Sequence, residues 1–454
     1  MPPKRLHLTG FILLLLAAVL AACGGAEVVE EVVTTPAGIE EPDYATGSER
    51  SGDVPPPPET GGKVAATRVA PEAAAAEAEA VRSEAPADAM SVAPSTAGET
   101  AAELPPSTTF DQNSRLTAGE VDDNARWDDY LLYLRHYSGA AVVEVAVQER
   151  YQIRVTDTAG NPVLSARISI AAAGQEVMTL RTHSNGLAYF FPRALNQQAD
   201  SYRVTVTADS ASETFDIPAG GSQREWVVTL QSGGGGSQEA RLDVLFLIDA
   251  TGSMADEIFE LKANIEAIAA QVDALPSRPN VRFGMVAYRD RGDEYVTRLF
   301  DFTPDVQVFA EALAEVNADG GGDYPEDLNE ALSRAIHEPE WRVEGAVNLI
   351  FLVADAPPHL DYGQQNHYAA ESLEAARRGI KIYPIASSGL DSQGEYIFRQ
   401  LAQITGGRFI FLTYGPEGAG PSGTETTFEV SDYTVSALDD LVVGIIEEEL
   451  SYLR

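Results

Sequence analysis

Three oxygen-bearing side chains at alternate positions follow an apolar run. Asp249, Thr251 and Ser253 come directly after the hydrophobic stretch from Leu245 to Ile248. Such a run is typical of a parallel strand covered on both faces, and open α/β sheets bind ligands at the carboxyl ends of their strands. Carboxylate and hydroxyl oxygens are hard ligands that suit Mg²⁺. The spacing therefore predicts metal-dependent binding before it says anything about catalysis.

The same residues also suit the N-terminus of a helix. Serine and threonine are preferred N-caps, and an acid there interacts favourably with the helix dipole. Because capping and cation binding are compatible, the local sequence alone leaves both interpretations open.

Strands and helices alternate from residue 240 to the end. This alternation predicts a doubly wound α/β fold with a largely parallel sheet and helices on both faces. We expect strands at 241–249, 280–288, 296–301, 347–354, 380–386 and 407–413, and helices at 254–274, 304–317, 326–337, 364–378, 393–404 and 434–452.

Two further loops carry residues of the same kind. The first is Gly320-Gly-Gly-Asp-Tyr-Pro-Glu326, and the second contains Asp355 after a hydrophobic strand. Together with Asp249-x-Thr-x-Ser253, they resemble the metal-ion-dependent adhesion site of a von Willebrand factor A (vWA) domain. The resemblance covers about residues 240–454. The sequences of the loops, including Tyr288-Arg-Asp290, are similar to those of the hemicentin-like branch of the family.

The resemblance implies a ligand set for the cation. Thr251 and Ser253 would bind Mg²⁺, or another divalent cation such as Mn²⁺ or Ca²⁺, directly, while Asp249 and Asp355 act directly or through water. An acidic side chain of a partner would complete the coordination. One position departs from the family, because Tyr324 stands where a threonine is usual. Asp323 beside it is a further candidate ligand that would add negative charge, and the phenol of Tyr324 is the alternative, although it is bulky for the small shell of Mg²⁺.

The first 23 residues are typical of a processing signal. Lys4 and Arg5 precede the apolar stretch 11–20, and Leu-Ala-Ala-Cys23 follows it, which resembles a bacterial lipoprotein signal with its lipobox. Cys23 is the only cysteine, so no disulfide can form within the chain. The expected location is the outer surface of the cell membrane, with a lipid anchor at Cys23.

Composition divides the remaining chain. Residues 24–125 are acidic and rich in Pro and Ala, which predicts a disordered tether. Residues 126–231 hold a helical stretch at 127–135 and about seven short strands, which predicts a β-sandwich resembling immunoglobulin-like or prealbumin-like modules and serving as a spacer or weak binding module. Residues 232–239 form a Gly/Ser linker before the vWA-like domain at 240–454.

Charge and missing motifs limit the function. The net charge of -38 argues against binding to nucleic acid. We find no nucleophile elbow of a hydrolase, no phosphate loop and no paired histidines, so we expect no enzyme. His359 and His367 are expected to be solvated loop residues, and the alternative is that they lie at the edge of the metal site. Arg291-Gly-Asp293 is expected to be a charged turn rather than a recognition tripeptide. Asp290 is expected to form a surface salt bridge, and the alternative is that it approaches the rim of the metal site.

These observations predict a lipid-anchored surface protein. Its vWA-like domain would bind a protein or matrix ligand that offers a carboxylate to the bound cation. The alternative is a structural or assembly subunit of an envelope complex that uses the same domain for docking.

Overall fold

The computed structural model describes residues 116–195, 198–231, 239–256, 258–413 and 435–453, together with Phe428, Val430 and Tyr433. The expected lipidation site at Cys23, the tether up to residue 115 and the Gly/Ser segment at 232–238 lie outside the described residues. Within the described part of the chain, no helix is long and apolar enough to cross a membrane.

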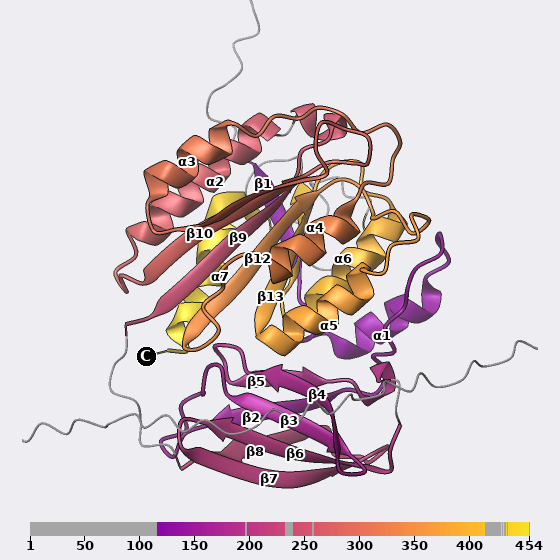
Figure 1. Cartoon of the computed structure of the whole chain (residues 1–454), viewed down its shortest axis with the longest axis vertical. Coiled ribbons are helices and arrows are strands. Elements are labelled where there is room, and N and C mark those ends of the chain that lie inside the picture. Colours follow the sequence, from indigo (N-terminus) through magenta and orange to yellow (C-terminus); the bar gives the residue numbers. More distant parts are fainter. Residues whose placement is uncertain are drawn as a thin grey trace, which may run out of the picture. The chain divides into compact units, whose positions relative to one another are not determined.

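An eight-stranded mixed sheet lies at the centre of the α/β domain (Figure 1). Its strand order is β11-β10-β9-β12-β13-β14-β1-β15. Strands β10, β9, β12, β13 and β14 run parallel to one another, whereas β11 and β1 pair antiparallel with their neighbours. The strands are β1 (Thr117–Val121), β9 (Arg241–Asp249), β10 (Asn280–Tyr288), β11 (Thr297–Thr303), β12 (Ala346–Ala354), β13 (Ile380–Ala386), β14 (Phe409–Thr413) and β15 (Ser436–Ala437).

Helices cover both faces of this sheet, as the alternation predicts. Side chains of β9 point alternately to the two faces, so that Leu245 and Leu247 belong to one buried cluster and Val244 and Phe246 to the other. The first cluster includes residues of α4 (Leu328–His337), α5 (Tyr368–Arg378) and α6 (Ser392–Thr405). The second includes residues of α2 (Ile258–Asp273), α3 (Val306–Ala314) and α7 (Leu438–Ser451).

Two smaller sheets form a region at residues 151–229, which we call the two-sheet region. One sheet has the order β5-β2-β8 and the other β4-β3-β6-β7. Rings from the two sheets meet directly, because Phe190 of β5 and Tyr202 of β6 lie edge to face with centroids 5.1 Å apart. The elements are β2 (Tyr151–Thr156), β3 (Arg167–Ala172), β4 (Gln175–Arg181), β5 (Leu187–Phe190), a 3-10 turn (Pro192–Ala194), β6 (Ser201–Ala208), β7 (Ala211–Pro218) and β8 (Glu225–Thr229).

The domain boundaries expected from composition need a correction at residues 116–136. Strand β1, placed in the disordered tether by its composition, pairs with β14 and β15 of the large sheet. Helix α1 (Trp127–His136) packs against α6, with the rings of Tyr133 and Tyr396 in contact. The two-sheet region is therefore an insertion between β1 and β9 of one sheet, which local composition does not reveal.

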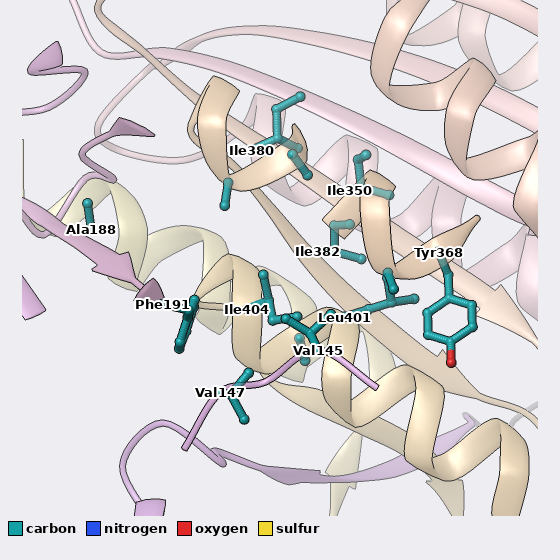
Figure 2. Packing of buried hydrophobic residues seen from close by; sticks show 14 of the residues in the cluster. Val145, Val147, Ala188, Phe191, Ile350, Tyr368, Ile380, Ile382, Leu401 and Ile404 are labelled. Carbon is teal, nitrogen blue, oxygen red and sulfur yellow. The ribbon is translucent and has the colours of Figure 1, made fainter. Parts of the chain in front are cut away.

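The insertion shares a buried apolar cluster with the α/β domain. Val145 and Val147, just before β2, and Ala188 and Phe191, from β5 and just after it, belong to the same cluster as Ile404 of α6 (Figure 2). Polar contacts join the same elements, since the Tyr368 hydroxyl of α5 donates to the Val143 carbonyl at 2.9 Å. The two-sheet region is thus packed on the helices that cover one face of the large sheet.

Candidate metal centre

Adjacent parallel strands bring two acids to one edge of the large sheet. Strands β9 and β12 pair in parallel with Ile248 opposite Val353. Asp249 ends β9 and Asp355 directly follows β12, so both carboxyls lie at the carboxyl edge. The Ser253 hydroxyl donates to Asp355 Oδ1 at 3.1 Å across the gap between the two loops. The structure therefore brings together these residues, which the sequence predicted as partners.

Hydrogen bonds fix the Asp-x-Thr-x-Ser loop. The Thr251 hydroxyl donates to Asp249 Oδ1 at 2.6 Å, and the Thr251 backbone N–H donates to the same oxygen at 3.0 Å. The hydroxyl oxygens of Thr251 and Ser253 lie 3.2 Å apart. Asp249 and Thr251 are fully buried, whereas Ser253 is exposed. We call Asp249, Thr251, Ser253 and Asp355 the first cation site.

Glycines allow the second loop to pack on the first. The Gly252 N–H donates to the Gly320 carbonyl at 3.0 Å. Gly321 adopts a left-handed φ of +72°, and a Cβ there would lie 2.7 Å from Glu326 Oε1 and 3.1 Å from the Thr251 Cβ. A side chain at this position would push the second loop off Thr251.

Glu326 adds a third acid that the sequence analysis did not single out. Its side chain is buried, and its Oε2 has no hydrogen-bond partner among the described residues. Burial, together with the charges of Asp249 and other nearby acids, raises the pKa of Glu326 to about 9. Burial and the neighbouring Asp355 raise the pKa of Asp249 to about 7. None of the ion pairs among the described residues joins a basic side chain to Asp249 or Glu326.

The Tyr324 side chain makes its hydrogen bonds with the loop after β13 and not with residues of the first cation site. Its hydroxyl donates to the Gly389 carbonyl at 3.0 Å and accepts from the Asp391 N–H at 2.7 Å, and both residues follow β13. Burial raises its pKa. Tyr324 thus links two loops. Asp323 is exposed, and its nearest ionic partner is His359, with 3.6 Å between Asp323 Oδ2 and His359 Nε2.

Residues after β10 and β12 are more buried than the sequence analysis expected. Asp290 and His359 are 4% and 6% exposed, so neither the expected surface salt bridge nor the expected solvated histidine is correct. The sequence pattern could not show this burial, because Asp290 and His359 are covered by contacts between segments that are distant in sequence, such as that of Tyr362 with Asp290. His367 caps α5 by accepting the Ala370 N–H. Arg291 pairs with Asp327 at 2.9 Å, which agrees with a charged turn.

The donor set fits a hard divalent cation. Two hydroxyls, two carboxylates and a nearby third acid supply only oxygen, and no ion pair among the described residues joins a basic side chain to Asp249 or Glu326. Mg²⁺, Mn²⁺ and Ca²⁺ all accept such ligands. This set of oxygen donors suits cation binding.

The comparisons with known proteins agree with this fold. Residues 243–414 match the family model of the von Willebrand factor A domain. An alpha-protein kinase, vwkA of Dictyostelium discoideum, is 29% identical over 160 residues, which cover 35% of this chain and 25% of that protein. The von Willebrand factor A domain-containing protein 7 of Rattus norvegicus is 35% identical over 150 residues, covering 33% of this chain and 15% of that protein.

Residues 243–414 are therefore a von Willebrand factor A domain, a class that generally serves protein interaction or adhesion. The chain spans a quarter or less of these two curated relatives. Among solved structures, proximal thread matrix protein 1 from the mussel byssus is 16% identical, with a TM-score of 0.28 over 36% of this chain and 40% of that chain.

Proposed function

We propose that this chain is a cell-surface lipoprotein whose vWA domain binds a protein or matrix ligand through a divalent cation. Asp249, Thr251, Ser253 and Asp355 would hold the cation, with Mg²⁺ as the expected ion. The bound cation would supply an open coordination position for a carboxylate of the ligand. No catalytic step is proposed.

One observation carries the proposal. Two hydroxyls and two carboxylates from loops after β9 and β12 converge within hydrogen-bond distance at the carboxyl edge of the sheet. Helix capping alone accounts for neither Asp355, which lies 102 residues from Ser253, nor the buried carboxyl of Glu326. A cation beside these acids would lower their pKa values, and its binding is expected to release protons.

The exposure of the first cation site suits a ligand that arrives from solvent. Ser253 is exposed while Asp249 and Thr251 are buried, so one side of the site faces water. The neutral hydroxyls leave positive charge on the cation, which favours an acidic partner. Asp323 lies toward His359, so its charge would affect the rim of the site more than the cation itself.

The remaining regions would position this domain outside the cell. A lipid on Cys23 would anchor the chain, and the acidic segment that follows would extend by charge repulsion. The two-sheet region, which we interpret as an immunoglobulin-like or prealbumin-like β-sandwich, would serve as a spacer or a weak binding module. The vWA domain itself would belong to the hemicentin-like branch. Palmitate labelling that is lost on Cys23→Ala would support the anchor.

The second candidate function is assembly of an envelope complex, with the vWA domain as the docking module. The insertion packed on α5 and α6 favours it, because a rigid multi-region surface suits a permanent partner. A stoichiometric partner recovered from membranes in every preparation would support assembly over adhesion.

Binding to immobilised matrix proteins with Mg²⁺ and with EDTA tests the proposed function. We expect EDTA and Ser253→Ala to reduce binding by at least about tenfold, since even loss of a residue that only hydrogen-bonds to a metal ligand costs that much affinity. Ser277→Ala is the matched control, because Ser277 is an exposed serine near the start of β10, at the other end of the strands. Equal binding with and without EDTA would contradict the proposal.

A further inference from the structure

Three side chains of the kinds that bind metal ions meet in the loops after β10, before α4 and after β12. Asp290 follows β10, Asp323 lies in the loop before α4, and His359 follows β12. One ligand atom from each lies within 4.8 Å of the others. Ligands on a common metal with bonds of about 2.1 Å lie roughly 3–3.5 Å apart, so modest side-chain movement would bring these three into coordination.

The imidazole of His359 is oriented like that of a metal ligand. Its Nδ1 lies 2.7 Å from Asp361 Oδ1, and a carboxylate can only accept, so Nδ1 carries the hydrogen. In the neutral imidazole, Nε2 is then left with a lone pair. This atom is buried and has no hydrogen-bond partner in the part of the chain that the structure describes. In metal sites, a ligating histidine usually donates a hydrogen bond from one ring N–H to a carboxylate, while its other ring nitrogen faces the metal. His359 has this orientation, with Nε2 facing acids.

Asp290 is also held in place for this role. The Tyr362 hydroxyl donates to its two carboxyl oxygens at 2.7 and 2.6 Å. The ring of Tyr362 stacks on that of His359, with centroids 3.8 Å apart and planes 12° from parallel. Tyr362 thus fixes both buried members, while Asp323 reaches the cluster from the exposed side.

A simple ion pair explains the cluster less well. A protonated His359 would place an Nε2–H toward a carboxylate at hydrogen-bond distance, but the nearest carboxylate oxygens of Asp323 and Asp290 lie 3.6 and 3.9 Å away. Within the described residues, these two acids form ion pairs only with His359. Two carboxylates and one buried lone pair therefore share a space that a cation would satisfy.

We propose that Asp290, Asp323 and His359 form a second divalent-cation site, separate from the first. An imidazole with two carboxylates favours a transition metal such as Zn²⁺ or Mn²⁺ over Mg²⁺, which prefers oxygen. Three protein ligands with one exposed member leave a coordination position open to solvent. The proposal assigns Asp323 to this site, and it does not depend on the function proposed for the first.

Calorimetric titration of the purified full chain with Zn²⁺, in saturating Mg²⁺, tests this proposal. We expect one bound Zn²⁺ that is weakened at least about tenfold by Asp323→Asn and more by His359→Gln. Asp323 is exposed, so its substitution should leave the fold intact and remain informative if His359→Gln does not fold. Asp319→Asn, an exposed acid of the same loop, is the matched control and should bind Zn²⁺ normally.

Ser253→Ala distinguishes the two sites. It should lose Mg²⁺ binding and retain Zn²⁺, so that failure of the first site and failure of the second give different results. The second site is overturned if Zn²⁺ does not bind in saturating Mg²⁺, if Asp323→Asn and His359→Gln bind it as the unmodified chain does, or if Ser253→Ala abolishes it.

Discussion

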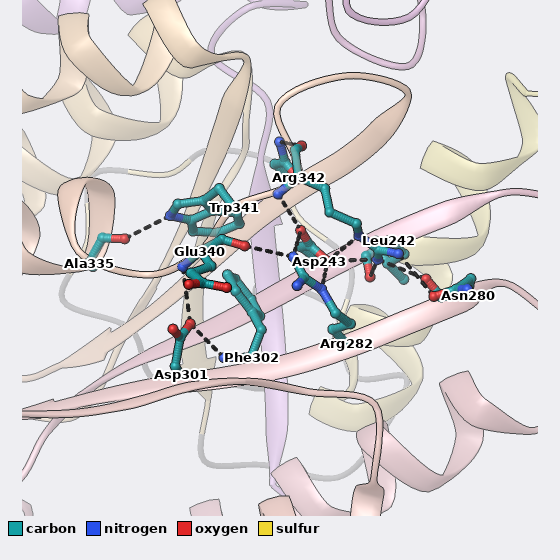
Figure 3. A network of polar contacts seen from close by, with 11 residues as sticks. Leu242, Asp243, Asn280, Arg282, Asp301, Phe302, Ala335, Glu340, Trp341 and Arg342 are labelled. Atoms are coloured by element: carbon teal, nitrogen blue, oxygen red, sulfur yellow. Dashed lines mark hydrogen bonds and ion pairs between the residues drawn. The ribbon is translucent and has the colours of Figure 1, made fainter. Parts of the chain in front are cut away.

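The two ends of strand β9 each bury an aspartate, and the two aspartates have opposite surroundings. Asp243 near the start receives Arg282 Nη2 at 2.7 Å and Arg342 Nε at 2.8 Å, together with the Arg342 N–H at 2.9 Å (Figure 3). Asp249 at the end receives the hydroxyls of Thr251 and Tyr288 and one backbone N–H. Both side chains are fully buried.

The contrast indicates two roles: the charge of Asp243 stabilises the fold, whereas the charge of Asp249 is available to bind a cation. A buried carboxylate is costly unless cations or several donors compensate it. At the start of β9 the chain supplies that compensation itself, and Asp243 in turn raises the pKa of Arg282. At the carboxyl edge, burial and a second acid raise the pKa of Asp249 to about 7, which is what a site awaiting an external cation would show.

Replacing Asp243 should have the largest effect on stability. Asp243→Ala would leave the guanidinium groups of Arg282 and Arg342 without their buried carboxylate and cost about 3–5 kcal/mol of unfolding free energy. Urea unfolding measures this loss. Asp249→Ala is the matched substitution on the same strand, and a similar loss there in metal-free protein would remove the contrast between the two ends.

A third group of buried charges joins the two-sheet region to the α/β domain. Lys381 Nζ lies 2.6 Å from Glu449 Oε1, and the Ser184 hydroxyl donates to Glu449 Oε2. Burial and the charge of Lys381 lower the pKa of the neighbouring His183 to about 3. This histidine is thus neutral in the folded protein over most of the acidic range.

Stability should therefore fall on acidification because of His183. Its ordinary pKa is about 6.5, so the unfolded chain takes up a proton below that pH while the folded chain does not. The loss should reach about 2 kcal/mol near pH 5 and continue toward pH 3. His183→Gln should reduce the loss, as read from urea unfolding at several pH values. An unchanged pH dependence in the variant would show that His183 is not responsible.

The acids at the carboxyl edge should act in the opposite direction. The folded pKa of Asp249, about 7, lies above its ordinary value of 3.8, so the folded state binds the extra proton between these values. Metal-free stability should consequently decrease as the pH rises from about 4 to 7, and continue to decrease toward 9 because of Glu326.

Asp249→Asn tests this direction. It removes the charge and should stabilise the metal-free chain above pH 7 by up to about 4 kcal/mol, because the pKa of Asp249 is raised by about three units and each unit corresponds to about 1.4 kcal/mol. The same variant should lose Mg²⁺ binding. Thermal unfolding in EDTA across this pH range provides the measurement, and Asp301→Asn, an exposed acid of β11, is the control. A destabilised Asp249→Asn would contradict the expected sign.

Sequence patterns predicted the elements that carry strong local signals. The apolar runs of β9 and β12 predict buried parallel strands. The acids that follow these runs lie close together because neighbouring parallel strands end at the same edge of the sheet. Asp249, Thr251, Ser253 and Asp355 were therefore predictable as a group.

The missed features depend on contacts between distant segments. Strand β1 is five residues long, and its partner Thr413 is 296 positions from Thr117. Glu326 resembles an ordinary acid before a helix, and its burial follows from the approach of the Gly320–Gly321 turn to Thr251. His359 and Asp290 are buried by Tyr362, whose position no local pattern specifies.

The most direct test of the central claim is thermal unfolding of the full chain near pH 8 with and without Mg²⁺. A ligand that binds the folded state stabilises it by mass action, so Mg²⁺ should raise the Tm by a few degrees. Ser253→Ala should abolish the rise, and Ser277→Ala should keep it. A Tm that does not respond to Mg²⁺, or responds equally in Ser253→Ala, would contradict a cation site at the end of β9.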